Sequence, residues 1–353
     1  MNPTAQSQRV ATPLPLAAPR LLVIVDTEEA FDWGKPHSRA ETSVDHMRFQ
    51  TRTQTIFERY GIAPTYVVDY PVASQEAGYA TLRPWLDAGK CHVGAHLHPW
   101  VNPPFDEVLS ARNSYPGNLP AALEKEKLRR LTETIAANFG RHPMIYRAGR
   151  YGVGPASGAI LEELGYTIDT SVVPYTDFRG DEGPDFSGFD NDPFWIGPSA
   201  RVLEVPLTVA WCGQLNGLGK QLQPGLMSRL GLRLHLPGIK ARAGLLERIR
   251  LTPEGVQFAE LQRLTDRLLA AGHKLFVFSY HSPSVVPENT PYVRDESELQ
   301  GFLRVIEQYC DYFCRVCGGA GTTPAEVFAS YAANDRSTAV PLPVDPLLAR
   351  RSG

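Results

Sequence analysis

Hydrophobic positions follow two alternating patterns between residue 21 and about residue 330. Short and nearly continuous apolar runs such as Leu21–Asp26 are typical of strands that are buried on both faces of a parallel sheet. Longer segments such as Leu119–Phe139 place apolar residues every three or four positions and end near Gly140, which is typical of amphipathic helices. The alternation predicts an α/β architecture with parallel strands.

Seven strands are predicted, and most of them are separated by helices. The strands are expected at 21–26, 64–68, 92–98, 144–147, 167–173, 202–209 and 274–281, and the helices at 45–60, 78–88, 119–139, 156–164, 258–271 and 303–317. Both a barrel and an open doubly wound sheet fit this pattern. No G-x-G-x-x-G sequence follows the first strand, so nothing favours a dinucleotide site.

The chain is expected to form one domain over residues 21–335, between a flexible, proline-containing N-terminal tail (1–20) and a C-terminal tail (336–353). Two segments depart from the alternation. The loop 177–197 begins with an acidic stretch, which we interpret as solvated. The insert 214–252 is basic between residues 220 and 250, which is typical of one or two extra outer helices, or of a peripheral surface for a phosphate-bearing or lipid-linked sugar donor.

Composition narrows the possible functions. Of the 353 residues, 43% are hydrophobic and 21% are charged, and the formal net charge is −3. These values are typical of a globular protein and argue against a nucleic-acid-binding role. No apolar run approaches the length of a membrane span, and residues 1–20 lack the apolar core of a signal peptide. We therefore expect a cytoplasmic protein.

Two short motifs each place a pair of metal-binding side chains at the end of a predicted strand. Asp26 and Glu28 end the first strand, and His96 and His98 end the third. Residues two apart on a strand point the same way, so each pair should converge. Carboxylates and imidazoles together form the ligand set of catalytic divalent metals, which activate water for hydrolysis. The alternatives are acids that cap the next helix and histidines with purely structural partners.

Three further candidates follow other predicted strands. Arg147 can hold a carboxylate base by paired hydrogen bonds, and the glycines beside it allow close backbone approach. Asp169 can anchor an arginine or a histidine. His281, at the end of the last strand, suits a general acid. All these motifs lie at carboxyl ends of strands, where barrels of this class carry their active sites.

The order of these motifs resembles the NodB-like polysaccharide deacetylase family. The stretches D-T-E-E, A-H-L-H-P-W and R-A-G-R-Y-G are most similar to the variant group associated with cell-surface polysaccharide and lipopolysaccharide biosynthesis. The resemblance runs from about Leu21 to His281. It implies a distorted (β/α)7 barrel and the hydrolysis of an N-acetyl group on an amino sugar or glycan precursor, which is nucleotide-linked or lipid-linked in a cytoplasmic enzyme.

The resemblance also implies roles for individual residues and a divalent metal, with zinc expected first and cobalt, nickel or manganese as alternatives. The implied roles are Asp26 as catalytic base, Arg147 as its orienting partner, His281 as general acid, Asp169 in support, Glu28, His96 and His98 as metal ligands, and Trp100, Arg150 and Tyr151 as substrate contacts.

The chain also departs from the usual family motifs. Thr27 separates the two acids, and only Leu97 separates the two histidines. Two alternatives therefore stay open. One is a sugar-binding relative without activity, and the other is a metal-independent barrel glycosidase with a second carboxylate about 5–10 Å from the first.

Overall fold

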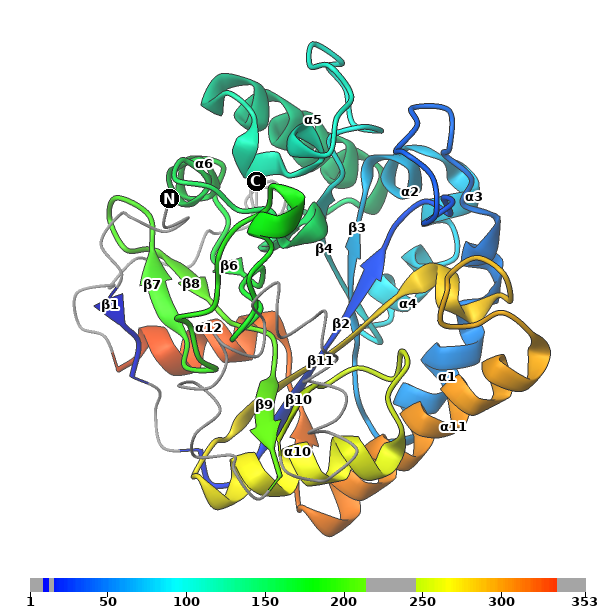
Figure 1. Ribbon diagram of the computed structural model, residues 1–353, viewed down its shortest axis with the longest axis vertical. Coiled ribbons are helices and arrows are strands. Elements are labelled where there is room, and N and C mark those ends of the chain that lie inside the picture. Colours follow the sequence, from blue (N-terminus) through cyan, green and yellow to red (C-terminus); the bar gives the residue numbers. More distant parts are fainter. Residues whose placement is uncertain (1–8, 13–15, 214–245, 335–353) are drawn as a thin grey trace, which may run out of the picture.

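The computed structural model describes residues 9–12, 16–213 and 246–334, and its centre is a ten-stranded sheet with strand order β1-β7-β8-β6-β5-β4-β3-β2-β11, in which β12 pairs with β2 (Figure 1). The strands are β1 (Arg9–Val10), β2 (Arg20–Thr27), β3 (Thr65–Val68), β4 (His92–Leu97), β5 (Ile145–Ala148), β6 (Ile168–Asp169), β7 (Phe194–Ile196), β8 (Val202–Glu204), β11 (Leu275–His281) and β12 (Ala320–Gly321). A separate two-stranded ribbon pairs β9 (Val209–Cys212) with β10 (Glu247–Arg250).

The order β11-β2-β3-β4-β5-β6-β8 forms one continuous parallel run. These are the seven predicted strands, so the parallel α/β prediction is confirmed. The run curls into an incomplete barrel, and the β9–β10 ribbon fills its gap beside β11. There the Val277 amide donates to Thr208 Oγ1 (2.8 Å) and the Ser279 amide donates to the Leu251 carbonyl (3.2 Å).

Helices follow most strands and cover the outside of the curled sheet (Figure 1). They are α1 (Thr51–Arg59), α2 (Tyr70–Ser74), α3 (Glu76–Tyr79), α4 (Arg83–Asp87), α5 (Ala121–Phe139), α6 (Ser157–Glu163), α10 (Phe258–Ala270), α11 (Glu296–Asp311) and α12 (Pro324–Ala332). In the described residues no helix is both long and apolar enough to cross a membrane.

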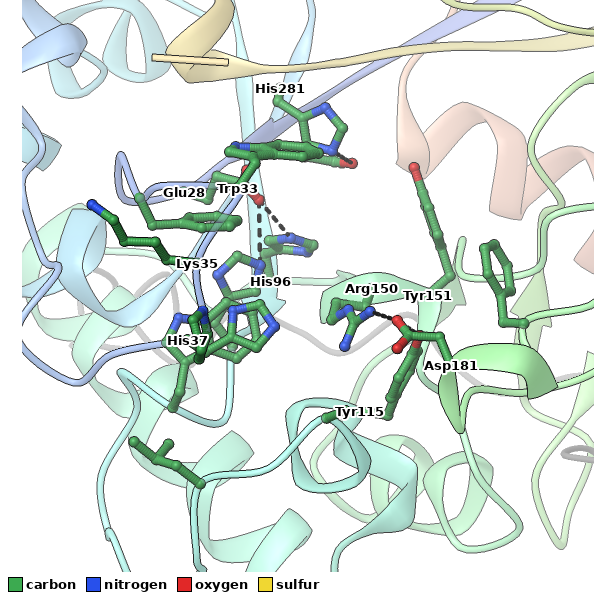
Figure 2. A pocket seen from close by; sticks show the side chains of 18 of the residues that line it. Glu28, Trp33, Lys35, His37, His96, Tyr115, Arg150, Tyr151, Asp181 and His281 are labelled. Carbon is green, nitrogen blue, oxygen red and sulfur yellow. Dashed lines mark hydrogen bonds and ion pairs between the residues drawn. The ribbon is translucent and has the colours of Figure 1, made fainter. Parts of the chain in front are cut away.

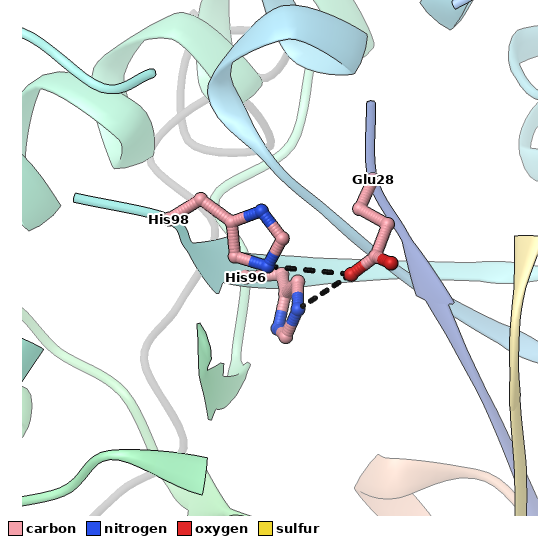
Figure 3. A group of neighbouring side chains, drawn as sticks. All are labelled: Glu28, His96 and His98. Atoms are coloured by element: carbon pink, nitrogen blue, oxygen red, sulfur yellow. Dashed lines mark ion pairs between the residues drawn. The ribbon is translucent and has the colours of Figure 1, made fainter. Parts of the chain in front are cut away.

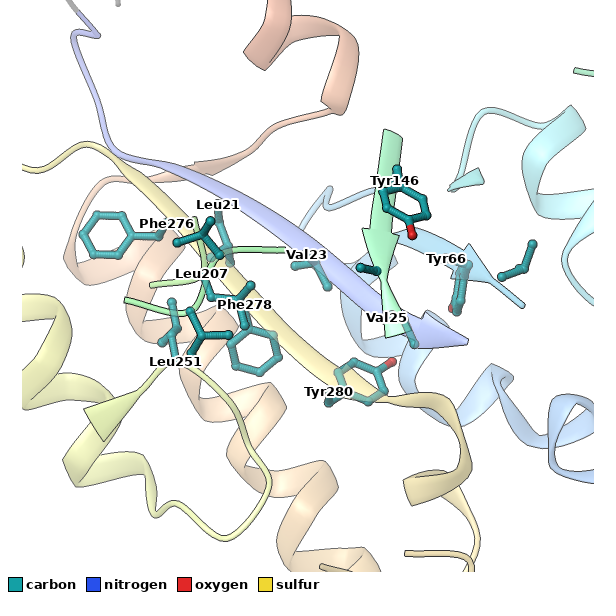
Figure 4. Close-up of a cluster of buried hydrophobic side chains, with 14 of the residues drawn as sticks. Leu21, Val23, Val25, Tyr66, Tyr146, Leu207, Leu251, Phe276, Phe278 and Tyr280 are labelled. Atoms are coloured by element: carbon teal, nitrogen blue, oxygen red, sulfur yellow. The ribbon is translucent and has the colours of Figure 1, made fainter. Parts of the chain in front are cut away.

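The two faces of β2 belong to two different parts of the core. Leu21, Val23 and Val25 pack into the larger cluster drawn in Figure 4, which includes side chains of α1 and α11. Leu22 and Ile24 belong to a second cluster on the opposite face of the sheet. All five are fully buried, which explains the unbroken apolar run in the sequence. By the same alternation, Asp26 projects on the side of Leu22 and Ile24.

Several predicted boundaries were wrong. The single helix expected at 78–88 is replaced by α3 and α4, and a further short helix, α2, precedes them. Pro71 and Pro84 each lie at the start of a short helix, where proline is tolerated because the first amides have no helical partner. The strand expected at 167–173 ends at Asp169. Side chains then replace backbone groups as partners: the Ser171 hydroxyl accepts from the Ala148 amide, and the Val172 amide donates to Glu204 Oε1.

Three segments outside the predicted strands also pair. Arg9–Val10, in the expected tail, pairs with β7, and β7 itself lies in the expected loop 177–197. Residues 247–250 of the basic insert form β10 rather than a helix. The expectations for residues 1–8, 214–245 and 335–353 fall outside the described residues.

Candidate active site

A cavity of about 740 Å³ opens where the carboxyl ends of β2, β4 and β11 meet (Figure 2). Eight of the residues predicted from the sequence line it: Asp26, Glu28, His96, His98, Trp100, Arg150, Tyr151 and His281. The strand register explains this convergence, because β11 pairs with β2 so that His281 lies opposite Asp26. The other two predicted residues, Arg147 and Asp169, are buried beside the cavity rather than lining it.

Glu28, His96 and His98 point toward one another (Figure 3). Glu28 Oε2 lies 3.4 Å from His96 Nε2 and 3.3 Å from His98 Nε2, and all three side chains are buried. The other ring nitrogens are occupied. His96 Nδ1 donates to the carbonyl of Arg147 (3.0 Å), and His98 Nδ1 lies 2.9 Å from Glu29 Oε2. Since a carbonyl can only accept, the Nδ1 of His96 carries a proton, and its Nε2 is directed at Glu28.

This group fits a metal ion. Two ligands bound at about 2.0–2.2 Å to a tetrahedral ion lie roughly 3.4 Å apart, which agrees with both separations from Glu28 Oε2. The second oxygen, Glu28 Oε1, is buried without a hydrogen-bond partner in the described residues. Burial raises the pKa of Glu28. The positive charge of His281 and the hydrogen bonds from His96 and His98 outweigh burial, and the net pKa lies below its usual range. The carboxyl is therefore anionic.

Glu29 contacts the ring nitrogen of His98 that faces away from Glu28, a role that the sequence did not predict. Its Oε2 lies against His98 Nδ1, and its Oε1 accepts from Trp100 Nε1 (2.7 Å). The indole also stacks on the His98 ring, with centroids 4.2 Å apart. Burial raises the pKa of Glu29 to about 8, and its amide donates to Asp69 (2.8 Å). Such outer partners fix the orientation of metal-binding imidazoles.

Asp26 forms a buried ion pair with Arg147. Arg147 Nη1 donates to Asp26 Oδ1 at 2.6 Å, and its Nε donates to the carbonyl of Thr170 (2.9 Å). The arginine side chain is fully buried. Arg147 thus contacts the acid through one hydrogen bond rather than the expected pair, because its Nε and Nη2 bind Thr170. It leaves Asp26 Oδ2 facing the cavity, 3.8 Å from His281 Nε2.

His281 is held by Glu254, another residue that the sequence reasoning missed. His281 Nδ1 lies 2.8 Å from Glu254 Oε2, and Glu254 Oε1 accepts from the His281 amide (3.0 Å) and from Ser284 Oγ (2.6 Å). Burial lowers the pKa of His281, but the charges of Glu254 and Glu28 outweigh it and raise the pKa to about 9. At neutral pH this imidazole is therefore protonated, with one N–H directed toward the cavity.

Among the described residues, Asp169 forms no ion pair with an arginine or a histidine. It accepts from Ser171 Oγ (2.5 Å), which in turn accepts from the amide of Ala148 (2.9 Å) at the end of β5. Burial raises the pKa of Asp169 to about 6, and its neighbour Glu204 has a raised pKa for the same reason. Asp169 therefore supports the strand end that carries Arg147 through Ser171, and the arginine acts on it only through its charge.

The segment after β5 is shaped to approach the histidines. A side chain at Gly149 would place its Cβ only 2.4 Å from the Leu97 carbonyl oxygen, so glycine is required there. Arg150 and Tyr151 both have positive φ (54° and 61°), a strained conformation for such residues and one that accompanies functional sites. Arg150 pairs with Asp181 of the acidic stretch, whose side chain is itself largely exposed to solvent.

Aromatic rings form much of the cavity wall. They include Phe31, Trp33, His37, Trp100, Tyr115, Tyr151, Phe178 and Tyr292. The face of a sugar ring carries C–H groups that pack well against aromatic faces, and the polar rim of the cavity can bind hydroxyls. Most of these residues come from loops, which have no periodic pattern that would identify them from the sequence.

No family model matches the chain, and no curated protein matches it. Solved structures that share its fold include two that match over most of their length. One is a protein from Mycobacterium smegmatis assigned as a polysaccharide deacetylase, with 14% sequence identity, coverage of 93% of this chain and 96% of that chain, and a TM-score of 0.52. The other is the allantoinase Puue, with 15% identity, coverage of 89% and 90%, and a TM-score of 0.52. The first likeness confirms the distorted barrel of the deacetylase type.

Proposed function

We propose that this chain is a metal-dependent hydrolase that removes the N-acetyl group from an amino sugar. Glu28, His96 and His98 hold a divalent metal, with zinc as our first choice. Two imidazoles and a carboxylate are a ligand set of catalytic zinc that keeps a position open. The single observation that carries the proposal is the geometry of this group, in which one carboxylate oxygen faces two imidazole nitrogens at 3.3–3.4 Å.

A metal bound there supplies Lewis-acid activation of water and of the amide carbonyl. The other steps belong to the chain. Asp26 takes a proton from the attacking water, with Arg147 fixing the direction of its carboxylate. His281 donates its Nε2 proton to the departing amine nitrogen, and Glu254 balances the charge of the imidazolium. A base and an acid on adjacent strands are the arrangement that amide hydrolysis needs.

The finer parts of the proposal concern the substrate. We infer an acetylated amino sugar that is linked to a nucleotide or a lipid, and a role in cell-surface polysaccharide or lipopolysaccharide biosynthesis inside the cytoplasm. The aromatic walls of the cavity support a sugar. The neighbour assigned as a polysaccharide deacetylase is consistent with it, whereas the fold alone does not choose the substrate.

The test is metal content and acetate release from one preparation. After exposure to zinc, cobalt, nickel or manganese and removal of free metal, we expect about one equivalent of one metal by mass spectrometry. Acetate release from acetylated amino sugars should stop when a chelator is added and return with that metal. His98→Ala should abolish both the metal and the activity.

His92→Ala is the matched control, because His92 lies at the opposite end of β4 from His98 and is outside the candidate metal groups. It should keep the metal and the activity. Full turnover in the presence of a chelator would favour the glycosidase alternative. Sugar binding without turnover and without stoichiometric metal would favour the inactive sugar-binding relative.

A further inference from the structure

Arg250 brings a positive charge to the cavity wall from the β9–β10 ribbon. Its Nη1 donates to the Tyr151 hydroxyl at 3.0 Å, and the guanidinium lies 5.8 Å from the centre of the same ring. A guanidinium has five N–H donors. In the described residues, one of these N–H groups donates to a side chain, and that side chain, Tyr151, is neutral.

The other fixed charges around the cavity are already paired. Asp26 pairs with Arg147, Arg150 with Asp181, and Lys35 with Asp32. Glu28 faces its two histidines. Across the described residues no carboxylate lies within ion-pair distance of Arg250, and residues 214–245 contain no aspartate or glutamate. The positive charge of Arg250 is thus available to a ligand.

A second arginine on β10, Arg248, increases the positive potential near Arg250. Arg248 lies two residues earlier, on the same face of β10, and its guanidinium binds the Tyr175 carbonyl at 2.9 Å together with the Thr176 hydroxyl. It likewise forms no ion pair with a carboxylate in the described parts of the chain. Burial lowers the pKa of Arg250, but the charges of Glu254 and Asp26 reach it from beyond ion-pair distance and help to raise its pKa. Two neighbouring half-buried arginines that no described carboxylate contacts still favour an anion bound near them.

We propose that the substrate carries an anionic oxygen group, a phosphate or a carboxylate, and that the Arg250 guanidinium binds it. The inference rests on the proposed function, since it describes the substrate of the same cavity. An arginine fork pairs with two oxygens of such a group at once. The sugar ring then lies between Arg250 and the cluster of Glu28, His96 and His98, against the aromatic walls.

The test is a binding experiment on metal-depleted protein, so that it does not depend on turnover. The probes are N-acetylglucosamine, N-acetylglucosamine 1-phosphate and N-acetylmuramic acid. The affinity for each is measured by calorimetry at pH 7.5. We expect at least one of the charged sugars to bind about 10–100-fold more tightly than the neutral sugar, which is the size expected for charge-assisted hydrogen bonds. The phosphate and carboxylate arms identify which group is preferred.

Variants separate recognition from folding. Arg250→Gln should remove the preference for the charged sugar while the affinity for N-acetylglucosamine stays unchanged. Arg250→Lys keeps the charge without the fork and should retain part of the preference. Lys35→Gln is the matched control, because Lys35 lines the cavity but is paired with Asp32, and it should keep the full preference. Thermal unfolding of each variant confirms that it is folded.

Three results would overturn the inference: equal affinity for neutral and charged sugars in the wild type, an undiminished preference in Arg250→Gln, or no binding of any of the three sugars. The first two leave the proposed function standing, because metal content and acetate release test it separately. Loss of metal-dependent turnover with an intact charge preference would instead refute the hydrolase and keep the anion subsite.

Discussion

His98 and His281 are the same residue type in nearly the same local setting, yet they face different tasks. Each lies at the carboxyl end of a parallel strand, and the Nδ1 of each contacts a glutamate. His98 Nδ1 lies 2.9 Å from Glu29 Oε2, and His281 Nδ1 lies 2.8 Å from Glu254 Oε2. The Nε2 of His98 points at Glu28 beside His96. The Nε2 of His281 points toward the cavity and Asp26.

The difference lies in the glutamates. Glu29 shares its buried environment with Asp69 and Trp100, and burial raises its pKa to about 8. Glu254 accepts hydrogen bonds from His281 and Ser284, and its charge, together with that of Glu28, outweighs burial and raises the pKa of His281 to about 9. A metal ligand has to offer a lone pair, whereas a general acid has to hold a proton. The partner of each imidazole therefore decides its role more than the histidine itself.

The largest expected effect comes from replacing the two histidines in parallel. His281→Gln should reduce acetate release by about 10²–10⁴-fold, the usual contribution of a general acid, and should leave the metal content unchanged. His98→Gln should lose both. Metal analysis and turnover on the same samples make the distinction. If His281→Gln also lost the metal, the division of roles between the two histidines would be wrong.

Replacing the first glutamate should weaken metal binding. Glu29→Gln keeps the shape of the side chain but replaces one of its two oxygens, which face His98 Nδ1 and Trp100 Nε1, by an NH2 group that cannot accept a hydrogen bond. Outer-shell changes of this kind usually cost about 10–100-fold in metal affinity. Competition with a chromogenic chelator measures the change. Glu254→Gln is the matched control and should bind metal as the wild type does. Equal affinity in both variants would show that Glu29 has no role in holding the metal.

The regular parts of the molecule could be predicted from the sequence. The alternation of strand-like and helix-like segments predicted the seven strands and their parallel arrangement. Because the strand ends of a parallel sheet meet at one edge, it also predicted that Asp26, His96 and His281 lie near one another. The spacing of two residues in Asp26–Glu28 and His96–His98 correctly indicated that each pair faces one cavity.

The supporting residues could not be predicted because they depend on tertiary contacts. Glu254 lies 27 positions before His281, in the segment after β10 that has no periodic pattern. Glu29 is adjacent to Glu28, and strand alternation would place its side chain away from the cavity; its role arises only because the chain has left β2 at Thr27. Asp181 lies in a stretch whose composition is that of an ordinary solvated loop.

Removing the second glutamate should change the pH dependence. His281 has to be protonated to act as an acid, so turnover falls as the pH rises through its pKa of about 9. Glu254→Gln should move this alkaline limit toward the ordinary value of 6.5, which lowers turnover by at most roughly 30-fold at pH 8 and hardly at pH 6. Rates from pH 5 to 10 measure it. A profile that keeps its alkaline limit near 9 would exclude Glu254 as the cause.

Glu124 on α5 is also buried, and no imidazole contacts it in the part of the chain that the structure describes, so its stability effect sharpens the comparison. Its Oε1 accepts from Ser157 (2.5 Å), and burial raises its pKa to about 8 from 4.5. The folded state therefore holds a proton that the unfolded chain releases above pH 4.5. The stability that this proton contributes is complete below about pH 4.5 and is lost as the pH rises through 8.

Urea unfolding at pH 5, 7 and 9 measures this effect in the metal-depleted protein. The wild type should lose of order 1–3 kcal/mol more than Glu124→Gln over this range, since one pKa unit corresponds to about 1.4 kcal/mol and relaxation of the buried site reduces the full value. Glu133→Gln, an exposed residue on the same helix paired with Arg129, is the control and should follow the wild type. If the unfolding free energies of the wild type and Glu124→Gln changed equally with pH, Glu124 would not be held protonated by burial. Burial alone would then not explain the raised pKa of Glu29 either.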